Sequence, residues 1–317
     1  MRVGLIDVDN HKKLSGCFPN LVLMKLSAYH KRNGDVVTWY DPGGEYFDRV
    51  YMSKIFSFTP DYEETINAGE LIRGGSGYCI SIGPDGREYF DKSKDILLPY
   101  EIEHIRPDYS LYNITDTAYG FLSRGCPRGC SFCHVKAKEG LRSHKVADLS
   151  EFWDGQKYIQ ILDPNTLACK DWRDLLSQLN CGSYVEFNQG VDIRLMTTEK
   201  ADLLSRIKLK TVHFAYDRYQ DKEMIEPRFR ILKERTGWRR DKVQVYVLCN
   251  FDTTIDQDLD RINFLKSLDF SPYVMLYNKS SLKRGDIHFK VARWVNHRPF
   301  FNKWTFDEYL EHEKYTH

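Results

Sequence analysis

The sequence predicts an α/β protein with two parallel-sheet regions, and two observations lead to this prediction. In the second half of the chain, six apolar strand patterns alternate with helical patterns, as in parallel strands joined by right-handed crossovers. A shorter alternation of strand and helix patterns covers residues 1–85. Between the two lies 83–115, with Pro84, Pro99 and Pro107, which we expect to be an irregular connection.

The first region is expected to begin with a strand, a helix and two further strands. These elements are Arg2–Val8, Leu21–Arg32, Val36–Tyr40 and Arg49–Ile55, and another strand is expected within Ile72–Ile82. The helix should end before Asn33-Gly34, a common stop signal. Together these elements predict a small Rossmann-like unit.

The second region supplies six strands and five helices. The expected strands are Tyr119–Ser123, Tyr158–Leu162, Tyr184–Phe187, Val212–Tyr216, Val243–Leu248 and Tyr273–Tyr277. The expected helices are Val146–Trp153, Trp172–Leu179, Thr198–Ile207, Lys222–Arg235 and Ile255–Leu268. A doubly wound sheet and a partial barrel both fit this order. Polar or turning residues follow every strand, namely Arg124, Asp163, Asn188-Gln189, Asp217, Asn250 and Asn278. Because a βα barrel builds its site at those strand ends, they favour the barrel.

Composition excludes several classes of protein. The 317 residues carry 46 Lys+Arg against 45 Asp+Glu, so the net charge of +1 argues against a broad phosphate-binding surface. With 42% hydrophobic residues the chain has enough apolar material for a core, which excludes disorder. No apolar run is long enough to span a membrane, and the start MRVGLIDVDN does not resemble a signal peptide. We therefore expect a cytoplasmic protein with no membrane partner.

Three of the eight cysteines are crowded as C-x3-C-x2-C at Cys126, Cys130 and Cys133. A disulfide framework is unusual in a reducing cytosol, so a metal or cluster is the better interpretation. Three thiolates satisfy three irons of a [4Fe–4S] cluster and leave the fourth iron open. Zinc stays an alternative, although its nearest fourth ligand, His134, adjoins Cys133. Three buried structural thiols are the other alternative.

The segment AYGFLSRGCPRGCSFCHV resembles the radical S-adenosylmethionine (radical SAM) enzymes, with Phe132 before the last cysteine. The resemblance covers 113–285 and implies a partial (β/α)6 barrel. It also implies a [4Fe–4S] cluster on the three cysteines, with S-adenosylmethionine (SAM) on the open iron. An electron from a flavodoxin- or ferredoxin-like reductant would cleave SAM to a 5′-deoxyadenosyl radical, which abstracts hydrogen from a substrate.

The same resemblance assigns SAM-binding roles to residues that follow the strands. Candidates for the amino group, carboxylate, ribose and adenine are Asp163, Asn165, Gln189, Asp192, Arg194, Tyr216, Asp217, Leu248 and Asn250. For Arg194, a salt bridge to a nearby aspartate is an open alternative to a cofactor carboxylate. Cys249 could donate a hydrogen atom or be a small buried hydrophobe. The remaining cysteines show no second cluster spacing, which argues against the methylthiotransferase branch.

Residues 1–112 resemble a compact cobalamin-binding domain together with a connecting segment. Asp9-Asn10-His11, Ser53-Lys54-Ile55 and Gly74-Gly75 carry this resemblance, although Leu14 stands where the family has glycine. Cobalamin therefore stays open as a cofactor. A degenerate domain that serves as a lid or substrate platform is the alternative.

The carboxyl-terminal segment 286–317 mixes basic and aromatic residues. We expect a helix that closes the barrel, with an apolar stripe of Phe289, Ala292, Trp294 and Val295. A nucleic-acid surface is the alternative, so nucleic acid is not excluded as a partner.

The predicted function is a radical SAM enzyme of unassigned substrate, with cobalamin-dependent methyl transfer left open. An iron–sulfur or redox-sensing protein that does not turn over SAM is the alternative from another class.

Overall fold

The computed structural model describes all residues except 13–15, 85–87, 278, 284 and 315–317. The chain forms two compact units, Met1–Gln160 and Ile161–His317. Within the described residues, no helix is both long enough and apolar enough to cross a membrane.

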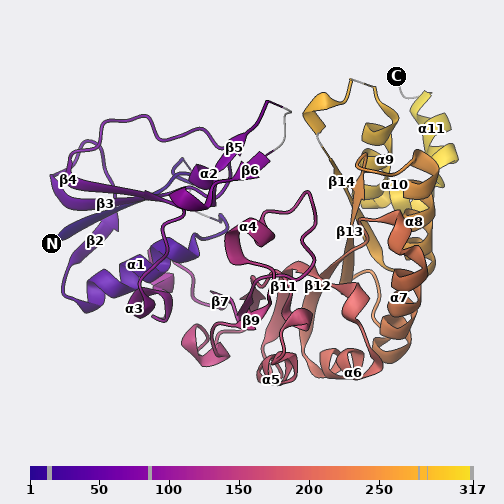
Figure 1. Cartoon of the computed structure of the whole chain (residues 1–317), viewed down its shortest axis with the longest axis horizontal. Coiled ribbons are helices and arrows are strands. Elements are labelled where there is room, and N and C mark those ends of the chain that lie inside the picture. Colours follow the sequence, from indigo (N-terminus) through magenta and orange to yellow (C-terminus); the bar gives the residue numbers. More distant parts are fainter. Residues whose placement is uncertain (13–15, 85–87, 278, 284, 315–317) are drawn as a thin grey trace. The chain divides into compact units, whose positions relative to one another are not determined.

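The first unit is built on a four-stranded parallel sheet (Figure 1). Its strands are β1 (Arg2–Asp7), β2 (Val36–Trp39), β3 (Phe47–Ser53) and β4 (Ala68–Gly74), in the order β2-β1-β3-β4. The central strand β1 is buried along almost its whole length, as expected for a parallel strand covered on both faces. The chain leaves β1 toward β2 on one side and continues with β3 on the other. The carboxyl ends of β1 and β3 therefore form the switch point of this sheet.

Helix α1 (Leu21–Arg32) has the bounds that the sequence predicts. Asn20 caps its start by accepting a hydrogen bond from the backbone N–H of Leu23 at 3.2 Å. Its apolar face packs with β1 through a cluster that includes Val3, Leu5, Leu23 and Leu26.

The connection after β4 contains more regular structure than the sequence predicts. Its elements are α2 (Ser76–Cys79), β5 (Ile80–Ile82), β6 (Glu88–Phe90), η1 (Lys92–Lys94), α3 (Tyr100–Glu103) and η2 (Tyr109–Tyr112). Asp108 ties this connection to α1, because its carboxylate accepts hydrogen bonds from Ser27 and Lys31, both at 2.6 Å.

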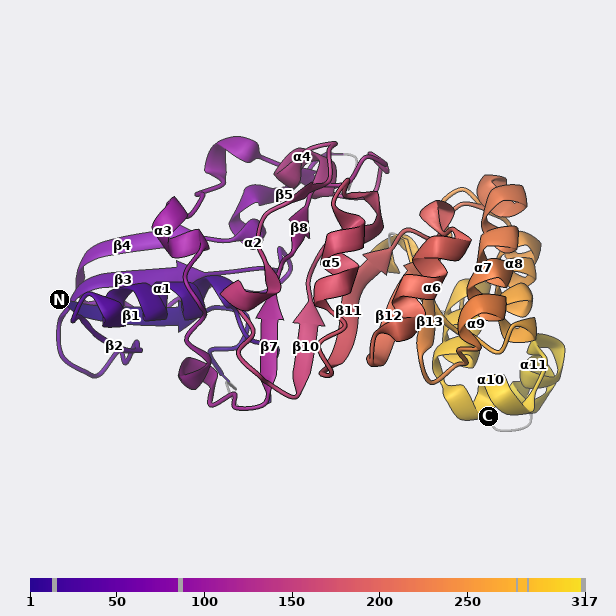
Figure 2. The ribbon, with the colours of Figure 1, turned by 90° about the horizontal axis from the view of Figure 1, so that it is seen from below.

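A second parallel sheet has six strands in the order β14-β13-β12-β11-β10-β7. The strands are β7 (Thr117–Gly120), β10 (Tyr158–Ile161), β11 (Tyr184–Val191), β12 (Leu209–Ala215), β13 (Val243–Cys249) and β14 (Ser271–Leu276). The crossover helices are α5 (Trp172–Gln178), α6 (Thr198–Arg206), α7 (Lys222–Thr236) and α8 (Ile255–Ser267), which line the same face (Figure 2). The strand order never reverses. This excludes the doubly wound alternative for these six strands, because a doubly wound sheet reverses its order at a switch point.

Three expectations in this region need correction. The first predicted strand ends at Gly120, three residues early, because the chain leaves β7 and then forms a separate short strand. In place of the predicted helix at 146–153 there is only the 3-10 turn η3 (Leu149–Glu151). The N–H groups of Val146 and Ala147 bond to Leu122 O, which keeps the chain extended there. Strand β11 continues past Phe187 to Val191 through an irregular register, which is typical of a bulge.

The expected single helix at the carboxyl terminus is three helices, α9 (Ile287–Asn296), α10 (Arg298–Lys303) and α11 (Phe306–Lys314). Helix α9 buries Val291, Trp294 and Val295, so two of the four residues in the predicted stripe are fully covered. The side chain of Asn296 pairs with the backbone of Val274 in β14 through bonds of 2.8 and 3.0 Å. Helix α9 therefore docks on the last strand of the sheet.

Candidate functional site

The three crowded cysteines lie on one excursion of the first unit, residues 125–143, which we call the cysteine segment. It leaves β8 (Ser123–Arg124), contains helix α4 (Val135–Glu139) and returns through β9 (His144–Lys145). Strands β8 and β9 pair antiparallel, so the segment is closed at its base. The thiols of Cys126 and Cys130 are half-buried and that of Cys133 is exposed.

Backbone geometry at the base of the cysteine segment requires glycine. Gly125 has φ +83°, and a Cβ atom there would lie only 2.2 Å from the carbonyl oxygen of Arg142. Gly129 has φ +58°, also in the left-handed region. The N–H of Cys126 bonds to Gly140 O at 3.2 Å, and that of Cys133 to Cys130 O at 3.1 Å. The segment is therefore a compact loop in which Cys130 and Cys133 are the two ends of one turn.

This donor set fits a [4Fe–4S] cluster in its chemistry, with three thiols on one loop whose glycines permit close approach. Among the residues that the structure describes, no three His, Cys, Asp or Glu side chains converge as they would around a metal ion. Binding of a cluster would therefore require the three thiols to turn toward a common point.

The zinc alternative depends on His134, which has another partner. His134 Nε2 lies 3.1 Å from Glu88 Oε2 on β6, and its ring packs near Phe90 at 6.5 Å between centroids. The imidazole is therefore directed toward the β5–β6 hairpin, and a fourth zinc ligand from this residue would cost that ion pair.

In the second unit, the loop after β11 holds an ion-paired group. Arg194 Nε donates to Asp192 Oδ1 at 2.7 Å, and its guanidinium also reaches Asp221 Oδ2 at 3.3 Å. This is the salt bridge that the sequence leaves open as an alternative for Arg194. Asp221, at the start of α7, is a member of the group that the sequence analysis missed. Two carboxylates on one guanidinium leave the group with a net negative charge, which suits a cationic ligand group.

Asp217 follows β12, and burial raises the pKa of its carboxyl group to about 6. The nearby cations Arg261 and Arg194 and a hydrogen bond from the backbone of Leu248 act in the opposite direction. The charges of Asp192 and Arg194, after β11, therefore act on the carboxylate of Asp217, after β12. The backbone of Leu248, near the end of β13, is hydrogen-bonded to the same carboxylate. Asn250 follows β13 with φ +63°, and its Nδ2 donates to Tyr277 O at 3.1 Å, so it joins the ends of β13 and β14.

Four predicted residues stand apart from this group. Asp163 and Asn165 are only 4% and 1% exposed in the turn after β10, where Asp163 accepts a bond from Thr166 at 3.0 Å. Contact between these two and a cofactor amino group would require the turn to open. Gln189 is exposed within the irregular part of β11. Tyr216 follows the end of β12, but its side chain is fully buried against Phe229 of α7 and lies in the core. Asn278 lies outside the described residues.

Cys249 is fully buried at the end of β13, and burial raises the pKa of its thiol. Its Sγ lies 3.7 Å from Val247 O. Along β13, Val243, Val245, Val247 and Cys249 are all buried while the residues between them are half-buried, so Cys249 points to the helix-covered face. This arrangement is that of the small buried hydrophobe.

The opposite face of the sheet carries a row of aromatic side chains that the sequence analysis missed. His213 of β12 stacks on Tyr246 of β13 with centroids 5.3 Å apart, and Tyr246 meets Tyr273 of β14 edge-on at 6.1 Å. His213 Nδ1 lies 2.6 Å from the carbonyl oxygen of Phe187, which requires this nitrogen to carry the proton. Side chains alternate between the two faces of a strand, so the sequence could have predicted that these aromatic residues lie on the face opposite the buried valines.

The cobalamin-like residues of the first unit are engaged with their own unit. The carboxylate of Asp9 accepts bonds from Ile55 N (2.6 Å), Phe56 N (3.3 Å) and the Thr59 hydroxyl (2.7 Å). Ser53 accepts a bond from Asn20 at 2.8 Å.

His11 and Gly75 are engaged in the same way. His11 Nδ1 bonds to Val8 O at 2.8 Å, and a Cβ at Gly75 would lie 2.3 Å from Lys54 O. Leu14 lies outside the described residues. All of these contacts lie within the first unit, and cobalamin binding stays a prediction from the resemblance.

Arg261 on α8 is the most informative residue that the sequence analysis missed. It is fully buried, and it donates to the backbone carbonyls of Tyr216 and Leu248, at the ends of β12 and β13. A basic residue within a helical pattern normally marks the solvated face, so only its spacing of three residues from Asp258 gave a signal.

No protein-family model matches this chain, and a search of curated proteins finds no match.

Proposed function

We propose that this chain is a radical SAM enzyme that abstracts hydrogen from a substrate not yet identified. One observation carries the proposal: a compact loop presents three cysteines as C-x3-C-x2-C directly after β7 and β8, and β7 is the first strand of a six-stranded parallel sheet. Two further findings support it. The sheet is wound in one direction, as an open (β/α)6 barrel requires, and polar groups gather at the ends of β11, β12 and β13.

The reduced [4Fe–4S] cluster with SAM would supply one-electron cleavage of the sulfonium and a hydrogen-abstracting radical. The chain's own part is to hold and orient these groups. Cys126, Cys130 and Cys133 would ligate three irons. Asp192 and Asp217 would attract the cationic sulfonium and amino groups, and Arg194 would pair with a carboxylate through its forked donors if it exchanged one aspartate for that group. Cobalamin is not part of the proposal, because the residues that carry the resemblance bond within their own unit.

The reductant is proposed to be a small acidic electron carrier of the flavodoxin or ferredoxin type. Between residues 124 and 145 there are six basic residues, Arg124, Arg128, Lys136, Lys138, Arg142 and Lys145, and one acidic residue, Glu139. Arg128, Lys136 and Arg142 are exposed. A positive surface on the cysteine segment would steer an acidic partner toward the cluster.

The substrate is proposed to contact the aromatic row of His213, Tyr246 and Tyr273. Tyr273 is 40% exposed, so one end of the row is open to a ligand. An aromatic row with a histidine and hydroxyl groups suits a flat or apolar group with polar edges.

The test is anaerobic reconstitution with iron and sulfide, reduction, and a search for 5′-deoxyadenosine in the presence of SAM. The wild-type chain should take up a [4Fe–4S] cluster and release 5′-deoxyadenosine slowly even without substrate. Cys130→Ala should lose both, whereas Cys181→Ala, a half-buried cysteine outside the motif, should keep both. A cluster that forms but never consumes SAM would favour the iron–sulfur or redox-sensing alternative. Absence of any cluster would contradict both the radical SAM proposal and the iron–sulfur alternative.

A further inference from the structure

Glu139, the last residue of helix α4, bridges the two ends of the cysteine segment. Its Oε2 accepts a hydrogen bond from the backbone N–H of Gly125 at 3.0 Å, and its Oε1 accepts one from Arg124 Nη1 at 3.1 Å. The Glu139 side chain is only 9% exposed. One carboxylate therefore fixes the residue that immediately precedes Cys126.

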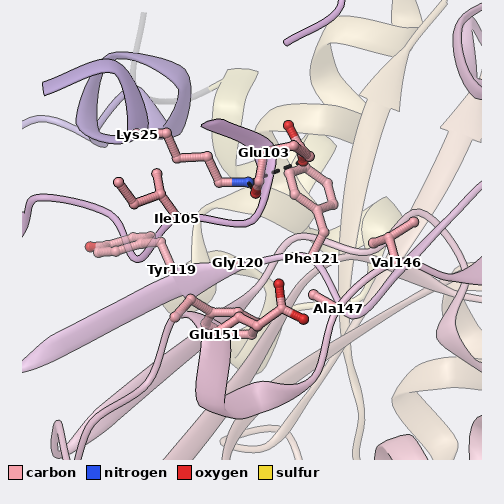
Figure 3. Close-up of a pocket in the computed structure, with 10 residues that line it drawn as sticks. Lys25, Glu103, Ile105, Tyr119, Gly120, Phe121, Val146, Ala147 and Glu151 are labelled. Atoms are coloured by element: carbon pink, nitrogen blue, oxygen red, sulfur yellow. Dashed lines mark hydrogen bonds and ion pairs between the residues drawn. The ribbon is translucent and has the colours of Figure 1, made fainter. Parts of the chain in front are cut away.

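Arg124 is itself held in place from two further sides. Its guanidinium lies 3.7 Å from the centroid of the Phe121 ring, and it reaches Glu103 Oε1 at 3.6 Å. Glu103 in turn pairs with Lys25 Nζ of α1 at 3.0 Å (Figure 3). These four charges alternate in sign from α1 to the base of the cysteine segment. All four side chains are partly buried, which makes their attraction stronger than that of fully exposed pairs.

A cavity of about 20 Å³ lies beside Lys25 and Glu103 and is lined by Tyr119, Phe121 and Val146 among others; Figure 3 shows these residues. This volume holds about one water molecule and no larger ligand. The region is therefore a packed support and not a substrate site.

Helix α4, which carries Glu139, is also anchored. Lys138 Nζ donates to the Ser76 hydroxyl at 2.7 Å, and Lys92 Nζ donates to the carbonyl oxygen of Lys138 at 2.8 Å. These two bonds hold helix α4, and therefore Glu139, in a fixed position at the base of the loop. It is the single acidic residue among six basic ones in 124–145, so no neighbour in that stretch can replace its charge.

We propose that Glu139 is the positioning residue of the cysteine segment: its carboxylate holds the base of the loop in the conformation from which the three thiolates reach a cluster. This inference rests on the proposed function, because it assigns Glu139 a role toward the cluster. Groups that orient metal ligands through hydrogen bonds typically change metal affinity by about 10–100-fold when removed.

The test compares Glu139→Ala and Glu139→Gln with Glu151→Ala. Glu151 is a matched control in the same unit, because its carboxylate also accepts one backbone N–H (Asp148, 3.0 Å) and one side-chain donor (His104, 2.7 Å). Three quantities are measured: iron and sulfide retained under a chelator challenge, the electron paramagnetic resonance spectrum of the reduced cluster, and the rate of thiol alkylation of Cys126 in the cluster-free chain.

Glu139→Ala should lose its cluster at least about 10-fold faster than the wild type, with an altered spectrum and faster alkylation of Cys126. Glu139→Gln, which keeps an acceptor for Gly125 N–H, should rescue part of the retention and restore the spectrum. Glu151→Ala should behave like the wild type in all three measurements. Cluster retention in Glu139→Ala equal to that in Glu151→Ala would overturn the inference while leaving the proposed function intact. A wild-type chain that takes up no cluster would overturn both.

Discussion

Arg261 of helix α8 donates a hydrogen bond to the backbone carbonyl oxygen of Leu248, the penultimate residue of strand β13, at 2.9 Å. Both Arg261 and its ion-pair partner Asp258 are 0% exposed. The guanidinium also bonds to Tyr216 O at the end of β12. One buried cation thus stabilises the ends of two strands from which Asp217 and Asn250 follow.

Replacing Arg261 by Met should lower the free energy of unfolding by about 3–5 kcal/mol, because Asp258 would remain buried without its cation. Urea unfolding of the full chain, followed by circular dichroism, measures this loss. The matched control is Arg239→Met, whose side chain is 71% exposed and pairs with Asp269, and it should cost at most about 1 kcal/mol. A double variant, Asp258→Leu with Arg261→Met, should recover much of the loss. Equal destabilisation by Arg261→Met and Arg239→Met would show that the buried pair has no special weight.

Asp217 predicts a pH dependence of stability. Its pKa is raised from 3.8 to about 6 by burial, so the folded state binds a proton more tightly than the unfolded state. Stability should therefore fall as the pH rises from about 4 to about 6 and then level off. The cost at pH 7 is at most about 3 kcal/mol, from about 1.4 kcal/mol per pKa unit.

Asp217→Asn should remove this contribution, so the difference in unfolding free energy between variant and wild type should grow in favour of the variant across that window. Urea unfolding at several pH values measures it. Asp202→Asn is the control, since Arg235 lowers the pKa of Asp202 and its contribution has the opposite sign. A difference curve that stays flat from pH 4 to pH 7 would contradict the buried environment of Asp217.

Gly125→Ala should disrupt the cysteine segment. Its Cβ would meet the carbonyl oxygen of Arg142 at 2.2 Å, in addition to the strain of φ +83°. Gly140→Ala isolates the strain alone, because Gly140 has φ +90° with no atom within 4 Å of the added Cβ. We expect a cost of about 1–3 kcal/mol for Gly140→Ala, whose φ of 90° and ψ of 176° are adopted almost only by glycine, and a larger cost for Gly125→Ala. Thermal unfolding and iron content check this prediction, and an equal loss in both variants would mean that the loop base can relax.

Lys136→Glu should slow reduction by an acidic electron carrier, because it reverses one exposed charge on the cysteine segment. We expect roughly threefold to tenfold slower reduction at low salt, with the difference shrinking as salt is added. Stopped-flow reduction by a flavodoxin measures the rate. Reduction by dithionite should change far less, and Arg298→Glu, an exposed control on α10, should leave the flavodoxin rate unchanged. A rate with flavodoxin that is insensitive to both Lys136→Glu and salt would place the docking surface elsewhere.

Local sequence patterns determined most of the secondary structure of this protein. Leu21–Arg32 is a helix with the predicted bounds, and Lys222–Thr236 and Ile255–Ser267 differ from prediction by one residue each. Apolar periodicity and caps act over a few residues, so they are visible in the chain itself. The same holds for the spacing of the three cysteines, which is a covalent property of the chain. At Val146 the local pattern predicted a helix, but a hydrogen bond to Leu122, far away in the sequence, keeps the chain extended there.

Tertiary structure alone decided how the six strands are ordered and which polar groups meet. The single direction of winding depends on the pairing of strands far apart in the chain, and local patterns do not encode that pairing. The burial of Tyr216 and Arg261, the ion pairing of Arg194 with Asp192 and Asp221, and the bond from Gly125 to Glu139 depend in the same way on neighbours brought together by folding. The sequence determines which side chains can carry a charge, but the tertiary packing determines the partner of each charge and its exposure to water.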